Sequence, residues 1–207
     1  MRLDALTRST GPVGGAREVV LEKRLLTLIV LGMLAAPAAR AQAPAYVHQT
    51  AMARVALAQK MAADPDLVRA VIAKNATGES LNEIRRKDRE WVDSPQYPLR
   101  KTMTTSACAQ RLRELTKDDL FVVEVILMDA QGANVCVSRE TSDYWQGDEA
   151  KFQRSFGADK EAFIDDPAFD ASTDTHAIQL TVIVFDGKTK IGALTLTLKV
   201  RKQDISD

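Results

Sequence analysis

Two long apolar runs near the C-terminus, separated by an Asp-Gly turn, constrain the fold most. Residues 175–185 read THAIQLTVIVF, residues 190–200 read KIGALTLTLKV, and DGKT (186–189) lies between them. An Asp-Gly pair between two such runs is typical of a tight β-hairpin, because the central residues of that turn adopt positive φ. The sequence therefore predicts two long antiparallel strands that pair with each other.

The alternation along 175–185 predicts that both faces of this sheet are covered. One face is wholly apolar and carries Ile178, Leu180, Val182 and Val184. The other face is mostly apolar and carries Ala177, Gln179, Thr181, Ile183 and Phe185. Because a sheet with one face in water alternates cleanly between apolar and polar residues, we expect helices or loops on both sides.

The rest of the chain supplies further strands after a helical first half. Apolar patterns and turn residues predict strands at 120–129 and 133–138, a short helix at 148–156 and a short strand at 162–167. Helical spacing predicts helices at 45–63, 64–74, 80–92 and 104–119. The predicted fold class is α+β, with N-terminal helices packed on a central antiparallel sheet of about five strands.

Two of these helices begin with capping signals. Asp64 precedes Pro65, a residue that suits the first turn of a helix because its missing N–H is not needed there. Ser80 and Glu83 have the spacing of a capping box, in which each side chain satisfies a backbone N–H of the other end.

A short apolar run near the N-terminus predicts export. Lys23 and Arg24 precede LLTLIVLGMLAAPAA (25–39), and ARA (39–41) follows. This order is that of a secretory signal peptide, and a membrane span would need about 20 apolar residues. We expect cleavage after Ala41, with an uncleaved anchor as the alternative, and a periplasmic protein that has no membrane span after cleavage.

The net charge bears on the class of partner, and the cysteine count bears on a possible disulfide. The formal net charge of zero argues against a nucleic-acid partner, which an overall positive field would favour. Cys108 and Cys136 form an even set, which permits a disulfide in an oxidising compartment. Two buried thiols are the alternative, and the spacing does not decide between them.

The loop SRETSDYWQGDEAKFQRSF (138–156) contains the candidate binding residues. Tyr144 and Trp145 offer flat faces that either hold a ligand or fill the underside of the loop. Polar neighbours either bind a ligand or cap the turn and the short helix. The candidate ligand-binding residues are Ser138, Asp143, Tyr144, Trp145, Gln146, Lys151 and Asp165, with Asp166 beside the last.

The second half resembles the Cache-type (PDC sensor) extracellular domain, a PAS-like module of bacterial receptors, in its single-unit periplasmic form. The resemblance covers about residues 100–200 and rests on VVEVILMDAQGANVCVS, TSDYWQGDEAKFQ and FIDD before the two closing strands. It implies an antiparallel sheet of about five strands and a pocket between the sheet and the segment after the second strand. The extended Tyr/Arg/Trp/Asp arrangement of amino-acid-binding members is absent, and Arg139 is the only arginine at the start of the loop.

The resemblance implies three segments and a sensory role. The segments are an upstream extension with the signal peptide (1–41), an N-terminal helical region (42–98) and a Cache-like α/β sensor domain (99–207). The implied ligand is a small polar metabolite, either a carboxylate or an amino-acid-like molecule. The expected protein partners are a membrane receptor or kinase and a second copy bound through the N-terminal helix. An interaction module that has lost its ligand is the alternative, and a secreted hydrolase is the least favoured hypothesis.

Catalysis, metal and cofactors are not expected. The chain lacks G-x-S-x-G, H-E-x-x-H, P-loop and G-x-G-x-x-G motifs. The acidic run DDPAFDASTD (165–174) lacks the spacing and central glycine of an EF-hand. His48 and His176 have no cysteine or acid at metal spacing, and the basic run RRKDR (85–89) is most simply a solvated helix face.

Overall fold

A computed structural model describes residues 45–170 and 173–200. All described residues belong to one compact unit. The predicted signal peptide (1–41) lies outside the described residues. Among the described residues, no helix has both the length and the apolar character needed to cross a membrane.

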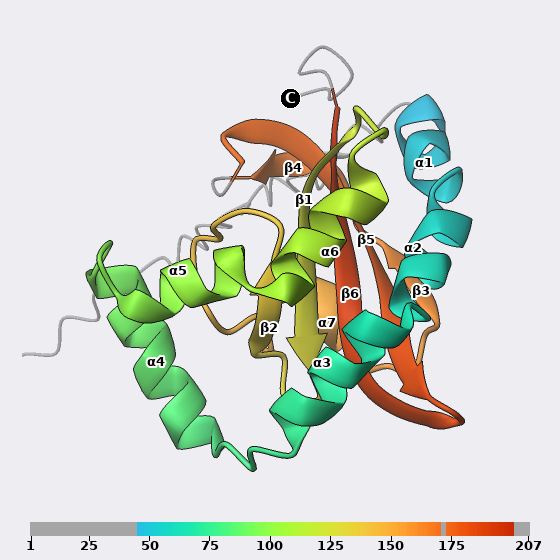
Figure 1. Cartoon of the computed structure of the whole chain (residues 1–207). Helices are drawn as coiled ribbons and strands as arrows, with labels where there is room; N and C mark the ends of the chain where they lie inside the picture. Colours follow the sequence, from blue (N-terminus) through green and yellow to red (C-terminus); the bar gives the residue numbers. More distant parts are fainter. Residues whose placement is uncertain (1–44, 171–172, 201–207) are drawn as a thin grey trace, which may run out of the picture. The chain divides into compact units, whose positions relative to one another are not determined.

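The described chain runs from helices into strands, as predicted (Figure 1). The helices are α1 (Ala45–Met52), α2 (Val55–Ala62), α3 (Pro65–Asn75), α4 (Leu81–Asp93), α5 (Pro98–Thr105), α6 (Ala107–Thr116) and α7 (Ala150–Gln153). The strands are β1 (Val122–Asp129), β2 (Asn134–Val137), β3 (Ala162–Ile164), β4 (Ala168–Asp170), β5 (Thr175–Asp186) and β6 (Thr189–Lys199).

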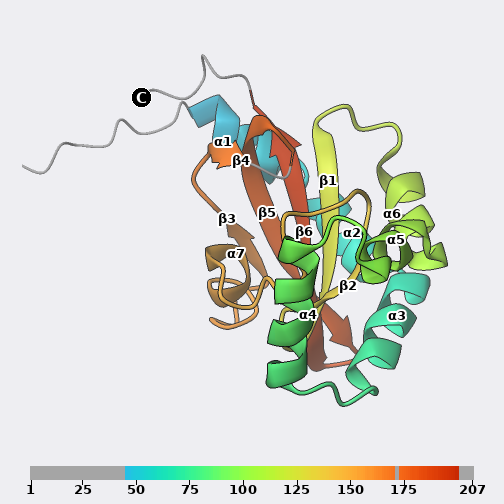
Figure 2. The ribbon, with the colours of Figure 1, turned by 90° about the vertical axis from the view of Figure 1, so that its left-hand side faces the viewer.

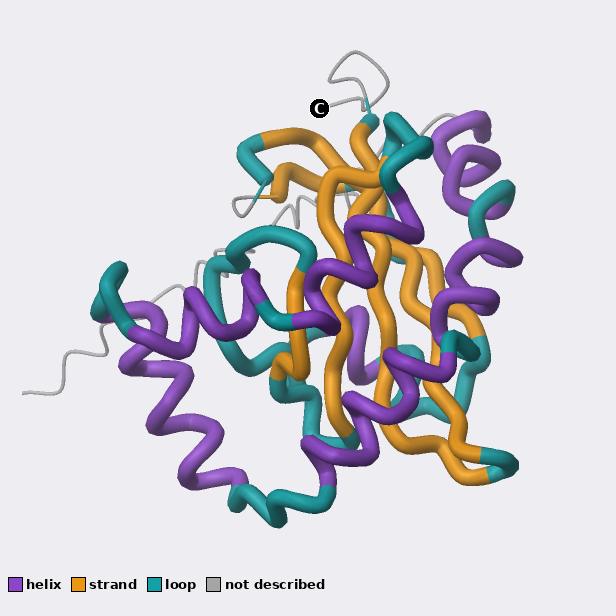
Figure 3. Tube along the Cα trace, viewed as in Figure 1, coloured by secondary structure: helices purple, strands orange, loops and turns teal. Residues whose placement is uncertain are grey.

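All strand pairs are antiparallel and form one sheet in the order β2-β1-β6-β5-β3, with β4 also paired to β5. The predicted hairpin of the two long strands is confirmed, because Asp186 pairs with Thr189 and Gly187 has a φ of 59°. The α+β prediction is confirmed, and Figure 3 shows helices α3 and α6 in front of the strands.

The helical layer covers the wholly apolar face of β5. Its four residues pack with α1, α2, α3 and α6 in the main core. From the helices this core takes Val47, Ala51, Ala58, Met61, Ala62, Leu67, Val71, Ala109 and Leu112. The helices before residue 98 and the sheet after it therefore share one hydrophobic core.

The opposite face of the sheet is covered by α7 and the chain around it. Phe152 of α7 packs on Ile126, Met128, Val137 and Ala193. The prediction that both faces are covered is therefore confirmed, and α7 lies across the sheet from α3 and α6 (Figure 2). This helix is a single turn, shorter than the predicted 148–156.

Three local predictions differ from the structure. The predicted helix at 45–63 is broken between α1 and α2 at Arg54, whose side chain pairs with Asp119 before β1. Helix α5 was not predicted, and Pro98 occupies its first turn. Strand β4 was not predicted either. The capping residues Asp64, Ser80 and Glu83 are confirmed.

The cysteines form a disulfide. Cys108 of α6 is bonded to Cys136 of β2, with their Cα atoms 6.0 Å apart. The bond ties the helical layer to the edge of the sheet, and it settles the alternative that the sequence left open.

Candidate functional site

A polar cavity of about 270 Å³ lies on the sheet face opposite the main helical layer. Strands β1 and β5 form its floor, the segment after β2 forms one wall, and the chain around β3 and β4 forms the rim. This is the position where the Cache resemblance implies a pocket.

The floor of the cavity is polar because one face of the sheet carries Thr, Gln and Glu side chains. Glu124, only 1% exposed, accepts a hydrogen bond from the Thr197 hydroxyl at 3.2 Å. Gln179 lies opposite Thr197 on the neighbouring strand, and the hydroxyls of Thr181 and Thr195 bond at 2.8 Å one step further along. Glu124, Thr181 and Thr195 thus have partners in the sheet, and Glu124 and Gln179 line the cavity.

The wall contains two nearly buried polar side chains from the loop. Lys151 is 5% exposed, and its Nζ donates to Glu149 Oε2 at 2.7 Å. Gln146 is 1% exposed, and its Nε2 donates to Asp143 Oδ1. Burying a lysine and an amide requires partners, and both have them within the loop.

The rim adds carboxylates and one aromatic ring. Asp165, Asp166 and Asp170 line the cavity beside Phe169, whose ring packs edge-on against His176 at 5.6 Å. Asp165 Oδ1 accepts from the backbone N–H of Asp166 at 2.9 Å and lies 4.0 Å from the guanidinium of Arg154. Among the described lining residues, carboxylates therefore outnumber the single amine of Lys151.

Asp143 lies behind this wall in an unusual electrostatic position. Burial raises its pKa first, the Glu149 carboxylate raises it further, and together they bring it to about 6. Lys151 and the hydrogen bond from Gln146 act in the opposite direction but do not cancel the rise. The carboxyl group of Asp143 therefore titrates close to neutral pH.

Tyr144 lies in a separate cluster. It is fully buried beside Ile84 and Trp91, and its ring centroid is 6.0 Å from that of Trp91. The Tyr144 hydroxyl accepts from Lys74 Nζ at 2.8 Å and donates to Glu79 Oε2 at 3.2 Å. Burial raises the pKa of Tyr144 far above its usual value, so the hydroxyl stays protonated.

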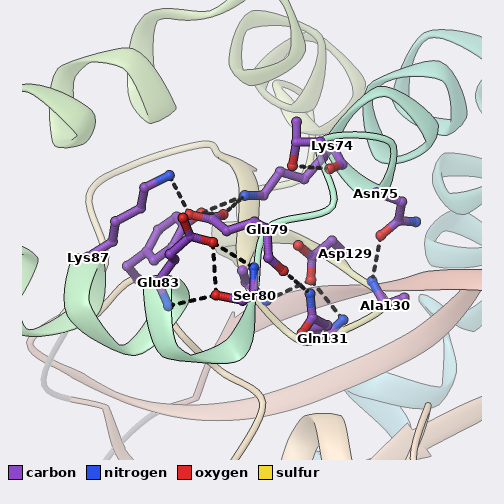
Figure 4. Close-up of polar contacts among 12 residues, drawn as sticks. Lys74, Asn75, Glu79, Ser80, Glu83, Lys87, Asp129, Ala130 and Gln131 are labelled. Atoms are coloured by element: carbon purple, nitrogen blue, oxygen red, sulfur yellow. Dashed lines mark hydrogen bonds and ion pairs between the residues drawn. The ribbon is translucent and has the colours of Figure 1, made fainter.

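Glu79 is the centre of the polar contacts around Tyr144. Its carboxylate pairs with Lys74 of α3 and Lys87 of α4, as Figure 4 shows. Burial alone would raise the pKa of Glu79, but the hydrogen bonds from the two lysines outweigh it and lower that pKa. Gln131 Nε2 also donates to the Glu79 carbonyl at 2.7 Å, which ties the β1–β2 turn to this cluster (Figure 4).

Trp145 is half-buried and packs against the same cluster. Its Nε1 donates to the Gln131 carbonyl at 2.8 Å, and the guanidinium of Arg85 lies 5.0 Å from its ring centroid. The backbone N–H groups of Tyr144 and Trp145 both donate to Asp88 Oδ1, at 2.9 and 3.0 Å. The run 85–89, interpreted as a solvated face, therefore also anchors the loop.

The structure brings three of the seven candidate residues to the cavity. Gln146, Lys151 and Asp165 line it, as does Asp166. Ser138 accepts from Val125 N at 2.7 Å through its hydroxyl, and it is not among the lining residues. Asp143, Tyr144 and Trp145 are not among them either. Whether any of these residues binds a ligand stays a prediction.

The sequence interpretation missed the floor of the cavity. Glu124 interrupts the apolar run VVEVILM, and Gln179, Thr181, Thr195 and Thr197 recur on one face of the two closing strands. A polar stripe on one face of strands that are covered on both sides was the signal that could have identified this floor.

Within residues 45–170 and 173–200, no group of three His, Cys, Asp or Glu side chains is arranged to hold a metal ion. A second cavity of about 330 Å³ lies between the end of α2 and β5, lined by Gln59, Ala62, Ala63, Glu161, Ile183 and Phe185. It contains none of the predicted site residues.

Comparison with solved structures finds sensor domains. The chain is similar to the ligand-binding domain of the Pseudomonas fluorescens chemoreceptor CtaA in complex with L-isoleucine (TM-score 0.44, 12% identity, covering 74% of this chain and 50% of that one). It is similar to the V. cholerae histidine kinase DctB sensor domain (TM-score 0.39, 11% identity, covering 73% and 54%).

A shorter match is the E. coli DcuS sensor domain (TM-score 0.35, 15% identity, covering 57% of this chain and 86% of that one). The chain spans about half the length of the first two structures. No protein-family model and no curated protein matches the sequence.

Proposed function

We propose that this chain is a periplasmic sensor domain that binds a small polar metabolite in the cavity between the sheet and the loop after β2. The proposal rests on the cavity lining. Three of its polar side chains are nearly buried in the protein yet face this one cavity: Glu124, Gln146 and Lys151. Burying polar groups is costly, so a core without a ligand role would normally carry apolar residues there.

The signal would pass to a membrane receptor or kinase. The predicted signal peptide supports a periplasmic location, and the Cache resemblance supports a sensory role. The loop that forms the cavity wall is held by α4 through Asp88, so a change in the wall has a direct route to a surface helix. No catalytic role is proposed.

The test is a thermal-shift screen of small carboxylates, amino acids and amines, followed by isothermal titration of each hit. Gln179→Leu, which replaces a polar floor residue by an apolar one of similar length, should weaken each hit at least tenfold. Gln110→Leu on the exposed surface of α6 is the matched control and should leave binding unchanged. The proposal is wrong if no compound binds, or if both variants bind like the wild type.

A further inference from the structure

The side chains of Asp143 and Gln146 are hydrogen-bonded to each other beside the cavity. Gln146 lines the cavity, and Asp143 lies behind it. The Gln146 Nε2 donates to Asp143 Oδ1 and, at 3.4 Å, to the Asp143 carbonyl. Within the described part of the chain, the amide oxygen of Gln146 accepts no hydrogen bond.

An ionised carboxylate accepts hydrogen bonds and cannot donate them, while an amide presents an oxygen at one corner and an NH₂ group at the other. An ionised Asp143 can therefore bond only to the NH₂ group of the Gln146 amide. The NH₂ group must turn toward Asp143, and this leaves the amide oxygen to the cavity side.

We propose that Asp143 is a specificity-determining residue that orients the Gln146 amide, so that the cavity offers an acceptor and selects a ligand with N–H donors, such as a small amine. This inference rests on the proposed function, because it concerns the ligand of the same cavity. It narrows the predicted ligand from a carboxylate or amino-acid-like molecule to the amine-bearing kind.

Several donors of the lining already have partners inside the protein. Lys151 Nζ donates to Glu149, Gln179 Nε2 donates to Asp170 at 3.4 Å, and the Thr141 hydroxyl donates to the Asp143 carbonyl at 2.5 Å. The rim meanwhile contributes the carboxylates of Asp165 and Asp166. A ligand that brings donors suits this lining better than one that brings a second carboxylate.

The orientation of Gln146 should depend on pH. The charged groups that face Asp143 are Glu149 and Lys151 from its own loop and α7, and Asp88 from α4. With a pKa of about 6, Asp143 is ionised at pH 7.5 and largely protonated at pH 5.0. A protonated Asp143 can bond to either corner of the Gln146 amide, by donating its O–H or by accepting through its other oxygen, so the amide oxygen is no longer held toward the cavity.

The experiment compares two probes with equal chains and opposite charge, 1,4-diaminobutane and succinate, by isothermal titration of the purified protein. We expect the diamine to bind at least tenfold more tightly than succinate at pH 7.5. Its affinity should fall about tenfold at pH 5.0, although an alkyl amine with a pKa near 10 stays charged at both pH values.

Asp143→Asn should reduce the preference to what the rim carboxylates Asp165 and Asp166 provide and should abolish the pH response, because an asparagine can donate to or accept from either corner of the Gln146 amide. Gln146→Leu should do the same by removing the amide. Asp186→Asn is the control, since an Asn-Gly pair suits the same turn, and it should keep the preference and the pH response.

A succinate preference, or an unchanged preference in Asp143→Asn, would overturn the inference and leave the proposed function standing. Binding of neither probe would also overturn it. The thermal-shift screen then shows whether the cavity binds another class of molecule or whether the proposed function fails as well.

Discussion

Tyr144→Phe removes one hydroxyl from a fully buried ring and keeps the ring packed against Trp91. The lost hydroxyl accepts from Lys74 and donates to Glu79. A hydrogen bond to a charged group contributes about 1.5–3 kcal/mol. Because Lys74 and Glu79 remain paired with each other, neither charge is left alone, and we expect a loss of about 2 kcal/mol, which is less than the roughly 3 kcal/mol minimum for two independent bonds of this kind.

Urea unfolding followed by circular dichroism measures this loss, which corresponds to about 4–8 °C in Tm for a domain of this size. Tyr97→Phe is the matched control, since its hydroxyl bonds to the partly exposed Glu90 and should contribute about 0.5 kcal/mol or less. Ligand affinity should be unchanged in both variants. Equal stability of the two variants, or a loss of binding in Tyr144→Phe with normal stability, would refute the placement of Tyr144 in the core.

Three further predictions concern stability. Asp143 has a folded pKa of about 6 against 3.8 for the free group, so the folded state holds the proton more tightly and stability should fall as pH rises from about 4 to 6. Asp143→Asn should remove this slope in urea titrations and gain about 1–2 kcal/mol at pH 7.5; an unchanged slope would contradict the assignment. Replacing Cys108 and Cys136 by alanine opens a link across 28 residues and should cost about 3 kcal/mol in unfolding free energy; equal stability with and without reductant would argue against the bond. Asp88→Ala leaves two backbone N–H groups without their acceptor, so their hydrogen exchange should accelerate more than tenfold and stability should fall by about 2 kcal/mol, whereas exposed Asp93→Ala should change neither.

The elements that the sequence predicted well are those specified by neighbours in the chain. Ser80 and Glu83 are three residues apart, and the Asp186-Gly187 turn directly joins the two strands that it pairs. Capping and tight turns depend on local hydrogen bonds and φ angles, so residue type at fixed spacing is sufficient to predict them.

The parts that the sequence did not predict depend on distant partners. Tyr144 meets Lys74 and Glu79 at separations of 70 and 65 residues, and no local pattern distinguishes a tyrosine that fills a core from one that lines a cavity. Glu124 and Thr197 are likewise 73 residues apart. That these two polar residues lie side by side on the sheet can be predicted only when the register of β1 and β6 is known.

The binding role of the cavity is tested most directly by mapping amide chemical shifts in ¹⁵N-labelled protein during titration with the tightest-binding compound of the screen. We expect the largest shifts on the floor, wall and rim of the cavity, at Gln146, Lys151, Asp165, Ala177 and Gln179. Shifts centred on the second cavity at Gln59 and Ile183, or no shifts at saturating ligand, would contradict it.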